Sequence, residues 1–501
     1  MEIINLTDGY KLDHRRQYPE GTEYVYSNWT PRSFKLKPEA KEGVVVFGIQ
    51  YLIKEYFIDQ FNKNFFNLPK EQAVKSFKRR VDSFLGPNNV GTEHIEALHD
   101  LGYLPIRVKA LPEGTLCPFR VPCMTIRNTD PKFFWITNFL ETLISCTLWL
   151  PMTTATTARL FKKNLIKHAR KTGWEDGFLG FSCHDFSMRG MAGYEAALMS
   201  GMAWLTSWNG SETIPAHEGV EYYYNADPDQ ELISATIPAT EHSVMCAGGM
   251  EDELGTFKRL INEVYPSGMV SIVSDTWDFW KVITEYLPAL KEDIIRRDGR
   301  VVIRPDSGDP VRIICGYDID DFDTEQERMD FIKENGVAVY KGAYQMLAET
   351  FGYTVNKKGY KELDSHIGLI YGDSITLLRQ KEIYTRLEAK GFAATNLCLG
   401  VGSYSLQYAT RDTHGFAQKA TWCQINGVPT PIFKDPKTDN GVKKSLKGLI
   451  KVEKTPKGLV AVDEVSMDEE HEGCLETVFH NGKLMRDYSL QDIRNRVNES
   501  L

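Results

Sequence analysis

Clusters of charged residues and glycines follow five short apolar runs in the middle of the chain. The runs are residues 178–183, 269–273, 300–303, 367–370 and 396–399. The clusters after them are His184, Asp185 and Arg189; Asp275 and Asp278; Arg304, Asp306 and Ser307; Gly372, Asp373 and Ser374; and Gly400 and Gly402. Arginine and backbone amides bind phosphate, whereas carboxylates repel it unless a divalent cation lies between them. Asp275 and Asp306 near Arg304 therefore indicate Mg²⁺ with a polyphosphate substrate, and a structural arginine–aspartate ion pair is the plainer alternative.

The five apolar runs are predicted to be buried strands, because helical stretches separate them. The helical stretches are residues 190–205, 252–264, 279–294, 325–333 and 376–390. This alternation favours a parallel sheet with helical crossovers, and it is long enough for a (β/α) barrel. The carboxyl ends of barrel strands face one mouth, where active sites form. Polar residues follow strands in any α/β protein, but five such clusters in succession favour a site.

The two ends of the chain show a different pattern. In the N-terminal part, we expect a strand or the start of a helix over 44–53, strands over 106–110 and 124–127, and a helical stretch over 131–171. From Phe416 onward, we expect antiparallel strands with Asn-Gly turns at 426–427 and 481–482, and a terminal helix over 489–497. We expect an α/β protein of two domains. Residues 1–150 and 405–501 form one, since chain ends often meet in one domain, and residues 151–404 form the barrel.

The composition is that of an ordinary globular chain, with 501 residues, 42% hydrophobic and 25% charged. A net charge of −9 excludes binding of polyanions through bulk charge, so an anionic substrate needs a local basic pocket. Nine cysteines without zinc-site spacing, no secretion signal and no membrane span indicate a cytoplasmic protein. Neither Gly482-Lys483 nor the run from Gly400 to Ser403 forms a known phosphate-binding glycine motif.

Seven motifs, in order along the chain, resemble the nicotinamide phosphoribosyltransferase family of type II phosphoribosyltransferases. They are HDFSMRG from His184, PATEHS from Pro238, VSDTWD from Val273, IRPDSGDP from Ile303, GDS from Gly372, LQYATRD from Leu406 and IFKDP from Ile432. LTDGYKLDH from Leu6 and TVFHNGKL near the end extend the resemblance to nearly the whole chain. The resemblance implies an irregular α/β barrel joined to a domain built from both chain ends. It also implies a homodimer with active sites at the subunit interface.

The resemblance further implies a role for each matching residue. Phe186 and Tyr10 of a partner subunit would stack on the nicotinamide ring, and Asp275 and Asp306 would hold Mg²⁺. The residues that would bind phosphoribosyl pyrophosphate are Arg189, Arg304, Gly372, Asp373, Gly402 and Ser403. Positive charge for the phosphates would also come from Arg32, Arg411, Lys419 and Lys434, partly from the second subunit. His242 would be the histidine that ATP phosphorylates to drive the reaction. Without the motif around it, Phe186 would be interpreted as a core residue. The lysines near 443–447 are equally well interpreted as part of a solvent-exposed surface.

Three departures from the family pattern affect the predicted site. Ser187-Met188 replaces Gly-Tyr, Ser403 to Ser405 interrupts a glycine-rich run, and Glu212 replaces an aspartate. The carboxylate of Glu212 can accept a hydrogen bond from the amide of nicotinamide and would repel nicotinate, unless its extra methylene turns it aside.

The alternatives are a related enzyme that acts on nicotinate, and a non-catalytic nucleotide-binding protein on the same fold. A nicotinate enzyme needs a cationic pocket for the substrate carboxylate. An unrelated barrel hydrolase with paired carboxylates does not explain the arginine and lysine set. The retained Arg304, Asp306 and His242 favour the enzyme over a non-catalytic protein.

Overall fold

The computed structural model describes residues 2–173, 177–433 and 446–501, which form two compact units. The first unit comprises Met1–Arg159, Glu218–Asp229 and Ala409–Leu501, and the second comprises Leu160–His217 and Gln230–Tyr408. The first unit thus includes Glu218–Asp229, a segment inside the range predicted for the barrel. In the described ranges no single helix is long and apolar enough to cross a membrane, although one bent pair, 131–139 with 141–172, passes by length and composition.

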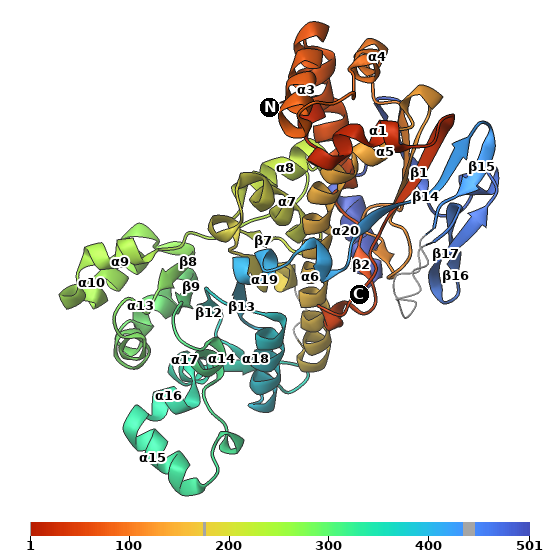
Figure 1. Ribbon diagram of the computed structural model, residues 1–501. Helices are drawn as coiled ribbons and strands as arrows, with labels where there is room; N and C mark the ends of the chain where they lie inside the picture. The colour runs from red at the N-terminus through yellow and green to blue at the C-terminus, as the bar shows by residue number, and fades with distance from the viewer. Residues whose placement is uncertain (1, 174–176, 434–445) are drawn as a thin grey trace. The chain divides into compact units, whose positions relative to one another are not determined.

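The first unit is built on an antiparallel sheet of seven strands in the order β15-β14-β1-β5-β3-β18-β19. The strands are β1 Thr22–Thr30, β3 Ile106–Ala110, β5 Met124–Asn128, β14 Ala417–Ile425, β15 Val428–Pro431, β18 Glu476–His480 and β19 Lys483–Leu484. Strand β1 pairs with β14 along its length, so the two ends of the chain share one sheet, as Figure 1 shows. Both predicted Asn-Gly turns are confirmed, since Asn426 and Asn481 have positive φ angles of 50° and 46°.

Helices, a short strand pair and one hairpin complete the first unit. They are α1 His14–Gln17, α2 Ile49–Tyr51, the π-helical stretches Leu52–Gln60 and Asn62–Phe66, α3 Lys70–Leu85, α4 Glu93–Leu101, α5 Ile136–Phe139, the start of α6 Glu141–Thr172, α20 Leu490–Glu499, and the pairs β2 Val44–Val45 with β4 Leu116–Cys117 and β16 Leu449–Thr455 with β17 Gly458–Val465. Trp29, Phe65 and Phe77 are fully buried in the core that joins the sheet to these helices. The run at 44–53, predicted as a strand or the start of a helix, contains both: it begins with β2 and continues into α2.

The second unit contains a parallel sheet of six strands in the order β7-β6-β13-β12-β9-β8. The strands are β6 Cys183–Asp185, β7 Gly210–Ser211, β8 Ser267–Val273, β9 Asp298–Arg304, β12 Ile367–Tyr371 and β13 Cys398–Val401. The main helices are α7 Tyr194–Trp204, the start of α8 Ile214–Tyr224, α9 His242–Gly248, α10 Glu253–Arg259, α11 Phe279–Lys281, α12 Leu287–Ala289, α13 Lys291–Arg296, α14 Pro310–Cys315, α15 Glu325–Asn335, α16 Val337–Lys341, α17 Ala343–Phe351, α18 Leu377–Ala389 and α19 Ser403–Gln407. A short hairpin, β10 Tyr353–Val355 with β11 Lys361–Leu363, is added to them.

One extended segment, residues 235–240, hydrogen bonds to both edges of this sheet. Ala235 pairs with Gly210 of β7, and Ala239 pairs with Ser271 of β8. Backbone hydrogen bonds of 2.8 and 2.9 Å join Ser271 to Pro238 and to Thr240. The sheet is therefore curled, and this segment spans the gap between its edges.

Two strand predictions in the second unit are wrong in position. Most of the run 178–183 is a 3₁₀ helix, Gly177–Phe181, and the strand begins only at Cys183, where pairing with Leu399 starts. Gly180 lies so close to Asn209 that a Cβ there would be 2.4 Å from its Oδ1, and this close approach accompanies the turn. The strand predicted at 396–399 lies at 398–401, so Gly400 is inside the strand and not beyond its end.

Candidate active site

The carboxyl ends of the parallel strands bring the predicted polar residues of the second unit together. Asp275 follows β8, Arg304 ends β9, and Asp306 lies two residues further on. Gly372 follows β12, and a Cβ there would be 2.7 Å from Oδ1 of Asp306. The absence of a side chain at Gly372 thus allows two strand ends to approach closely.

Asp275 organises this region through both of its carboxylate oxygens. Oδ2 accepts hydrogen bonds from the backbone amides of Asp306 and Ser307, at 2.8 and 2.7 Å, and from the Ser307 hydroxyl at 2.6 Å. Oδ1 lies 3.2 Å from Nε2 of His242. Burial alone would raise the pKa of Asp275, but the bonds from Ser307, the Asp306 amide and His242 outweigh it and lower the pKa. Asp275 is therefore ionised near pH 7, and its hydrogen bonds fix the orientation of its carboxylate.

Asp306 has the opposite electrostatic surroundings. Burial raises its pKa above the ordinary value, Arg304 opposes the rise, and the charges of Asp275 and Asp373 add to it. Arg304 donates through Nη2 to the backbone oxygen of Thr240 at 2.7 Å, while its buried Nε has no hydrogen-bond partner among the described residues. The cluster therefore holds excess negative charge beside an arginine with unused donor capacity.

Glycines and Ser403 keep backbone segments close together beside this cluster. A Cβ on Gly190 would be 2.0 Å from Oγ of Ser403, and a Cβ on Gly402 would be 3.5 Å from Oδ1 of Asp373. Arg189 is near enough to Arg304 for its charge to lower the pKa of Arg304, although burial contributes more to that shift. Arg189, Asp373, Gly402 and Ser403 thus lie in the same region as the aspartate cluster.

Phe186 and Glu212 lie at the side of the site formed by β6 and β7. The ring of Phe186 occupies the space that a side chain at Gly400 would fill, because a Cβ there would be 2.7 Å from Cδ2 of Phe186. Oε1 of Glu212 accepts a hydrogen bond from the Thr236 hydroxyl and lies 4.0 Å from Nδ1 of His184. Burial lowers the pKa of His184 to about 4, so this imidazole is neutral near pH 7.

Asp185 fixes the loops that carry Phe186 and Glu212. Its carboxylate is fully buried and accepts hydrogen bonds from the amide and hydroxyl of Ser187, at 2.9 and 2.5 Å. The hydroxyls of Ser211 and Thr213, on either side of Glu212, donate to the other oxygen at 3.4 and 2.8 Å. Because these bonds use both oxygens, Asp185 is a structural residue here and not a phosphate or metal ligand.

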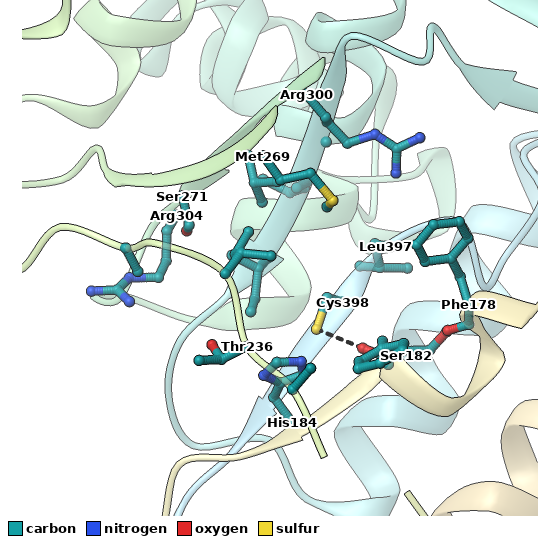
Figure 2. Close-up of a pocket in the computed structure, with 18 of the residues that line it drawn as sticks. Phe178, Ser182, His184, Thr236, Met269, Ser271, Arg300, Arg304, Leu397 and Cys398 are labelled. Atoms are coloured by element: carbon teal, nitrogen blue, oxygen red, sulfur yellow. Dashed lines mark hydrogen bonds between the residues drawn. The ribbon is translucent and has the colours of Figure 1, made fainter. Parts of the chain in front are cut away.

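A cavity of about 270 Å³ extends through the second unit from this site. Phe186, Glu212 and Arg304 line it at the carboxyl ends of the strands, and Met269 and Arg300 line it nearer their amino ends. Figure 2 shows the labelled side chains around it, including His184, Thr236 and Cys398. Most of its wall is apolar, which suits a planar aromatic substrate with few polar groups.

The remaining predicted residues lie elsewhere in the described chain. Tyr10, Arg32, Arg411 and Lys419 belong to the first unit. Arg32 and Arg411 are close enough for the charge of Arg411 to lower the pKa of Arg32, after the larger effect of burial. The Tyr10 side chain is 63% exposed and available to a partner. Lys434 lies outside the described residues.

Several functional features were not predicted from the sequence. Thr236 and Thr240 come from the segment at 235–240, which has no motif of its own beyond the start of PATEHS.

The polar residue Asp278 caps helix α11, because its carboxylate accepts a hydrogen bond from the Lys281 amide at 3.0 Å, so it is not part of the site. Among the described residues, no group of three or more His, Cys, Asp or Glu side chains could hold a metal ion unaided.

Comparisons with known proteins show the family of the chain. The model of the nicotinate phosphoribosyltransferase (NAPRTase) family matches residues 181–483, and the model of the nicotinamide phosphoribosyltransferase N-terminal domain matches residues 2–108. The chain is 50% identical to the nicotinamide phosphoribosyltransferase of Acinetobacter baylyi over 507 residues, which is 99% of this chain and 97% of that protein. It is 32% identical to the enzyme of the same name from Xanthomonas campestris, over 98% of this chain and 97% of that one.

Two solved structures share the fold at low sequence identity. Nicotinate-nucleotide pyrophosphorylase from Pyrococcus furiosus aligns with a TM-score of 0.57 and 15% identity, over 99% of this chain and 95% of that one. Human nicotinic acid phosphoribosyltransferase aligns with a TM-score of 0.53 and 14% identity, over 99% of this chain and 93% of that one. These alignments confirm the mixed α/β fold class.

Proposed function

The chain belongs to the nicotinamide phosphoribosyltransferases, within the nicotinate phosphoribosyltransferase family, and we propose that the site at the carboxyl ends of its parallel strands carries out their reaction. The protein is an enzyme that transfers phosphoribosyl from phosphoribosyl pyrophosphate to nicotinamide, giving nicotinamide mononucleotide and pyrophosphate in NAD salvage. The observation that carries this conclusion is 50% identity to a nicotinamide phosphoribosyltransferase over 99% of the chain.

Nicotinamide binds between Phe186 and Tyr10 of a second subunit, with its amide directed to Glu212. The pyridine nitrogen is a neutral nucleophile, so its attack on C1 of the ribose needs no general base. The protein has to orient the ring for attack. The apolar cavity supports the ring, and the Thr236 hydroxyl holds the Glu212 carboxylate as an acceptor for the amide NH₂.

The departing pyrophosphate lies against Arg304 and Arg189, with Gly372, Asp373, Gly402 and Ser403 along the ribose and its 5′-phosphate. The Nε of Arg304 is buried and has no hydrogen-bond partner in the part of the chain that the structure describes, which supports this placement because a preorganised donor stabilises developing negative charge. Arg32, Arg411, Lys419 and Lys434 add positive charge, partly from the second subunit.

Asp306 and Asp275 fit a Mg²⁺ ion shared with the substrate phosphates, which is how Mg²⁺ is usually bound in such sites. When bound, the ion neutralises charge on the pyrophosphate. The raised pKa of Asp306, caused by burial and by Asp275 and Asp373, marks a carboxylate cluster that a cation would stabilise. Asp275 and Asp306 would hold the ion, directly or through water, and both Asp275 oxygens already accept hydrogen bonds from neighbouring residues.

ATP phosphorylates His242, which couples ATP hydrolysis to the synthesis. Its imidazole is 47% exposed, so ATP can reach it. The Asp275 carboxylate holds Nε2, which leaves Nδ1 to attack the γ-phosphate with loss of ADP. Asp275 thereby links the phosphorylated histidine to the substrate side of the site, where its other oxygen orders the Asp306–Ser307 backbone.

We propose that the active unit is a homodimer, in which Tyr10, Arg32, Arg411 and Lys419, all from the first unit of the chain, help to complete the site, partly from the second subunit. The second unit is an irregular (β/α) barrel of the type II kind, and the segment at 235–240 that bonds to both sheet edges supports this. We propose residues 1–150 with 405–501, and residues 151–404, as the two domains of the chain, with Glu218–Asp229 packed in the first unit. The nine cysteines, none of them in a disulfide, support a cytoplasmic location.

Two variants test the site. Purified Asp306→Ala, assayed with nicotinamide, phosphoribosyl pyrophosphate and Mg²⁺, should lose about 10²-fold or more in turnover, the scale of one electrostatic element. His242→Ala should keep turnover without ATP but lose the improvement in substrate affinity that ATP gives the wild type. Near-normal turnover of Asp306→Ala, or an ATP effect that survives in His242→Ala, would contradict these roles.

A further inference from the structure

A small cavity in the first unit is lined by the stretch of chain that follows Tyr10. One side of it comes from residues within 11–18, and the other side comes from α4 and from residues within 135–139, which include α5. Its volume is about 10 Å³, which leaves room for a single particle the size of a water molecule or a halide ion. A polyatomic anion such as phosphate is too large for this volume.

Three residues on the walls of this cavity each have a buried nitrogen without a hydrogen-bond partner in the described ranges. These atoms are Nε of Arg15, Nδ1 of His94 and Nε1 of Trp135. His94 is 9% exposed and Trp135 is 4% exposed. The nitrogens of arginine and tryptophan can only donate hydrogen bonds, and a buried N–H group without an acceptor destabilises a fold. The cavity therefore needs an acceptor that the described residues do not supply.

The imidazole of His94 is neutral and is held in place by aromatic contacts. Burial, and after it the charge of Arg15, lower the pKa of His94 to about 3. Its ring packs edge-on against Trp135 and Phe77, with centroid distances of 4.9 and 5.5 Å. A neutral imidazole can carry its proton on Nδ1, so His94 can provide a third donor.

The charges around the cavity favour an anion over a water molecule. The buried Lys11 is compensated, because its ammonium lies 2.7 Å from the carboxylate of Glu141. Arg15 donates through Nη2 to the backbone oxygen of Val90 at 3.0 Å and forms no ion pair within 4.0 Å among the residues that the structure describes. A partly buried guanidinium without a counter-charge is stabilised by a nearby anion. A water molecule would accept the hydrogen bonds but would leave this charge uncompensated.

We propose that this cavity binds a single halide ion, which is chloride under physiological conditions, through the N–H groups of Arg15, His94 and Trp135. The guanidinium supplies the positive charge, and the imidazole and indole supply neutral donors. The ion ties the stretch of chain after Tyr10 to α4 and to the start of α5. The site lies within the first unit and does not depend on the proposed reaction.

Crystals of the full-length protein grown with sodium bromide in place of sodium chloride test the site directly, because bromide has an anomalous X-ray signal. We expect a bromide peak in contact with the three nitrogens. In solution, chloride should raise the midpoint of thermal unfolding by about 1–2 °C relative to the same concentration of gluconate, because an ion that binds only the folded state stabilises it.

Two variants separate the contributions of the donors. Trp135→Phe keeps an aromatic ring and removes the N–H group, and Arg15→Met removes the charge and keeps the apolar stem. Each variant, once shown to have a wild-type circular dichroism spectrum, should lose the shift that chloride gives. Trp149→Phe is the matched control, because Trp149 packs against the core of the first unit and does not line the cavity. This control should keep the shift.

A water molecule in the cavity and no bromide peak would overturn the proposal. A bromide peak without a chloride-specific shift would mean binding at crystal concentrations only and would also reject it, as would an equal shift in the wild type and both variants. Formation of nicotinamide mononucleotide by the wild type is measured in the same preparations. Its failure would count against the proposed function and not against the halide site.

Discussion

Three aspartates at the carboxyl ends of the parallel strands differ in their hydrogen bonds and therefore in their roles. Asp185 is fully buried and bound by the hydroxyls of Ser187, Ser211 and Thr213, so it holds loops in place. Asp275 is ionised and bound to His242, whereas burial raises the pKa of Asp306. The residue type alone does not distinguish these roles; the donors around each carboxylate do.

Glu212 is the residue to which we assign the choice of pyridine. It lines the cavity and bonds to Thr236, so its extra methylene does not remove it from the site. Glu212→Gln removes the charge and keeps the shape, and we expect it to gain turnover of nicotinate. A carboxylate facing a carboxylate in a partly desolvated site should discriminate by roughly 10²-fold. The measurement is kcat/KM for each pyridine.

Glu212→Asp is the matched control, because it keeps the charge and restores the residue expected for the family. It should keep the preference for nicotinamide. An unchanged ratio of the two specificity constants in Glu212→Gln would show that another residue sets the selectivity.

At the scale of elements, β13 positions the aromatic ring of the site by lacking a side chain. A Cβ on Gly400 would be 2.7 Å from Phe186 and 2.9 Å from the Tyr371 oxygen. Gly400→Ala should displace the ring and raise KM for nicotinamide by about tenfold, since overpacking costs about 1–3 kcal/mol. Steady-state kinetics on a variant with a wild-type circular dichroism spectrum measures this.

Gly368→Ala, on the neighbouring strand β12, is the control for a general effect on the sheet. Its Cβ would meet the flexible Arg300 stem at 3.2 Å, which can move. It should leave KM for nicotinamide near the wild-type value. Equal KM values for Gly400→Ala and the wild type would mean that Phe186 does not hold the ring.

The sequence pattern located β8, β9 and β12, although β8 and β9 each begin two residues before the predicted start, and it misplaced β6 and β13. The first three have five to seven residues and contain apolar residues that are buried in the sheet. Strand β6 has only three residues, and the apolar run before it forms a turn of 3₁₀ helix whose Phe178 and Phe181 line the cavity. Apolar residues that face a cavity and apolar residues in a strand are alike in composition, so pattern alone cannot separate them.

The residues of the site that lie in charged motifs at strand ends could be predicted from the sequence. Those that reach the site only through contacts between distant segments could not. Asp275, Arg304 and Asp306 follow strands and meet in the structure. Thr236 precedes the PATEHS motif and no local pattern marks it, and nothing in that motif indicates the bond of Arg304 to the backbone of Thr240. The steric roles of Gly372 and Gly400 likewise depend on contacts between strands far apart in the sequence.

At the scale of the whole molecule, shared active sites can be tested by mixing inactive subunits. Tyr10→Ala and Asp306→Ala should each be inactive, with the defects in different units of the chain. In mixed dimers, one of the two sites receives both wild-type residues. After confirmed subunit exchange, part of the activity should therefore return; no recovery would argue against a contribution of Tyr10 across the interface.

The central claim is that this enzyme makes nicotinamide mononucleotide from nicotinamide. The most direct measurement is kcat/KM of the purified wild-type protein for nicotinamide and for nicotinate, with phosphoribosyl pyrophosphate and Mg²⁺ and with the mononucleotide products quantified. We predict that nicotinamide is preferred by roughly 10²-fold or more, the scale of a repelled carboxylate at Glu212. Equal or greater efficiency with nicotinate, or no mononucleotide from nicotinamide, would contradict the account.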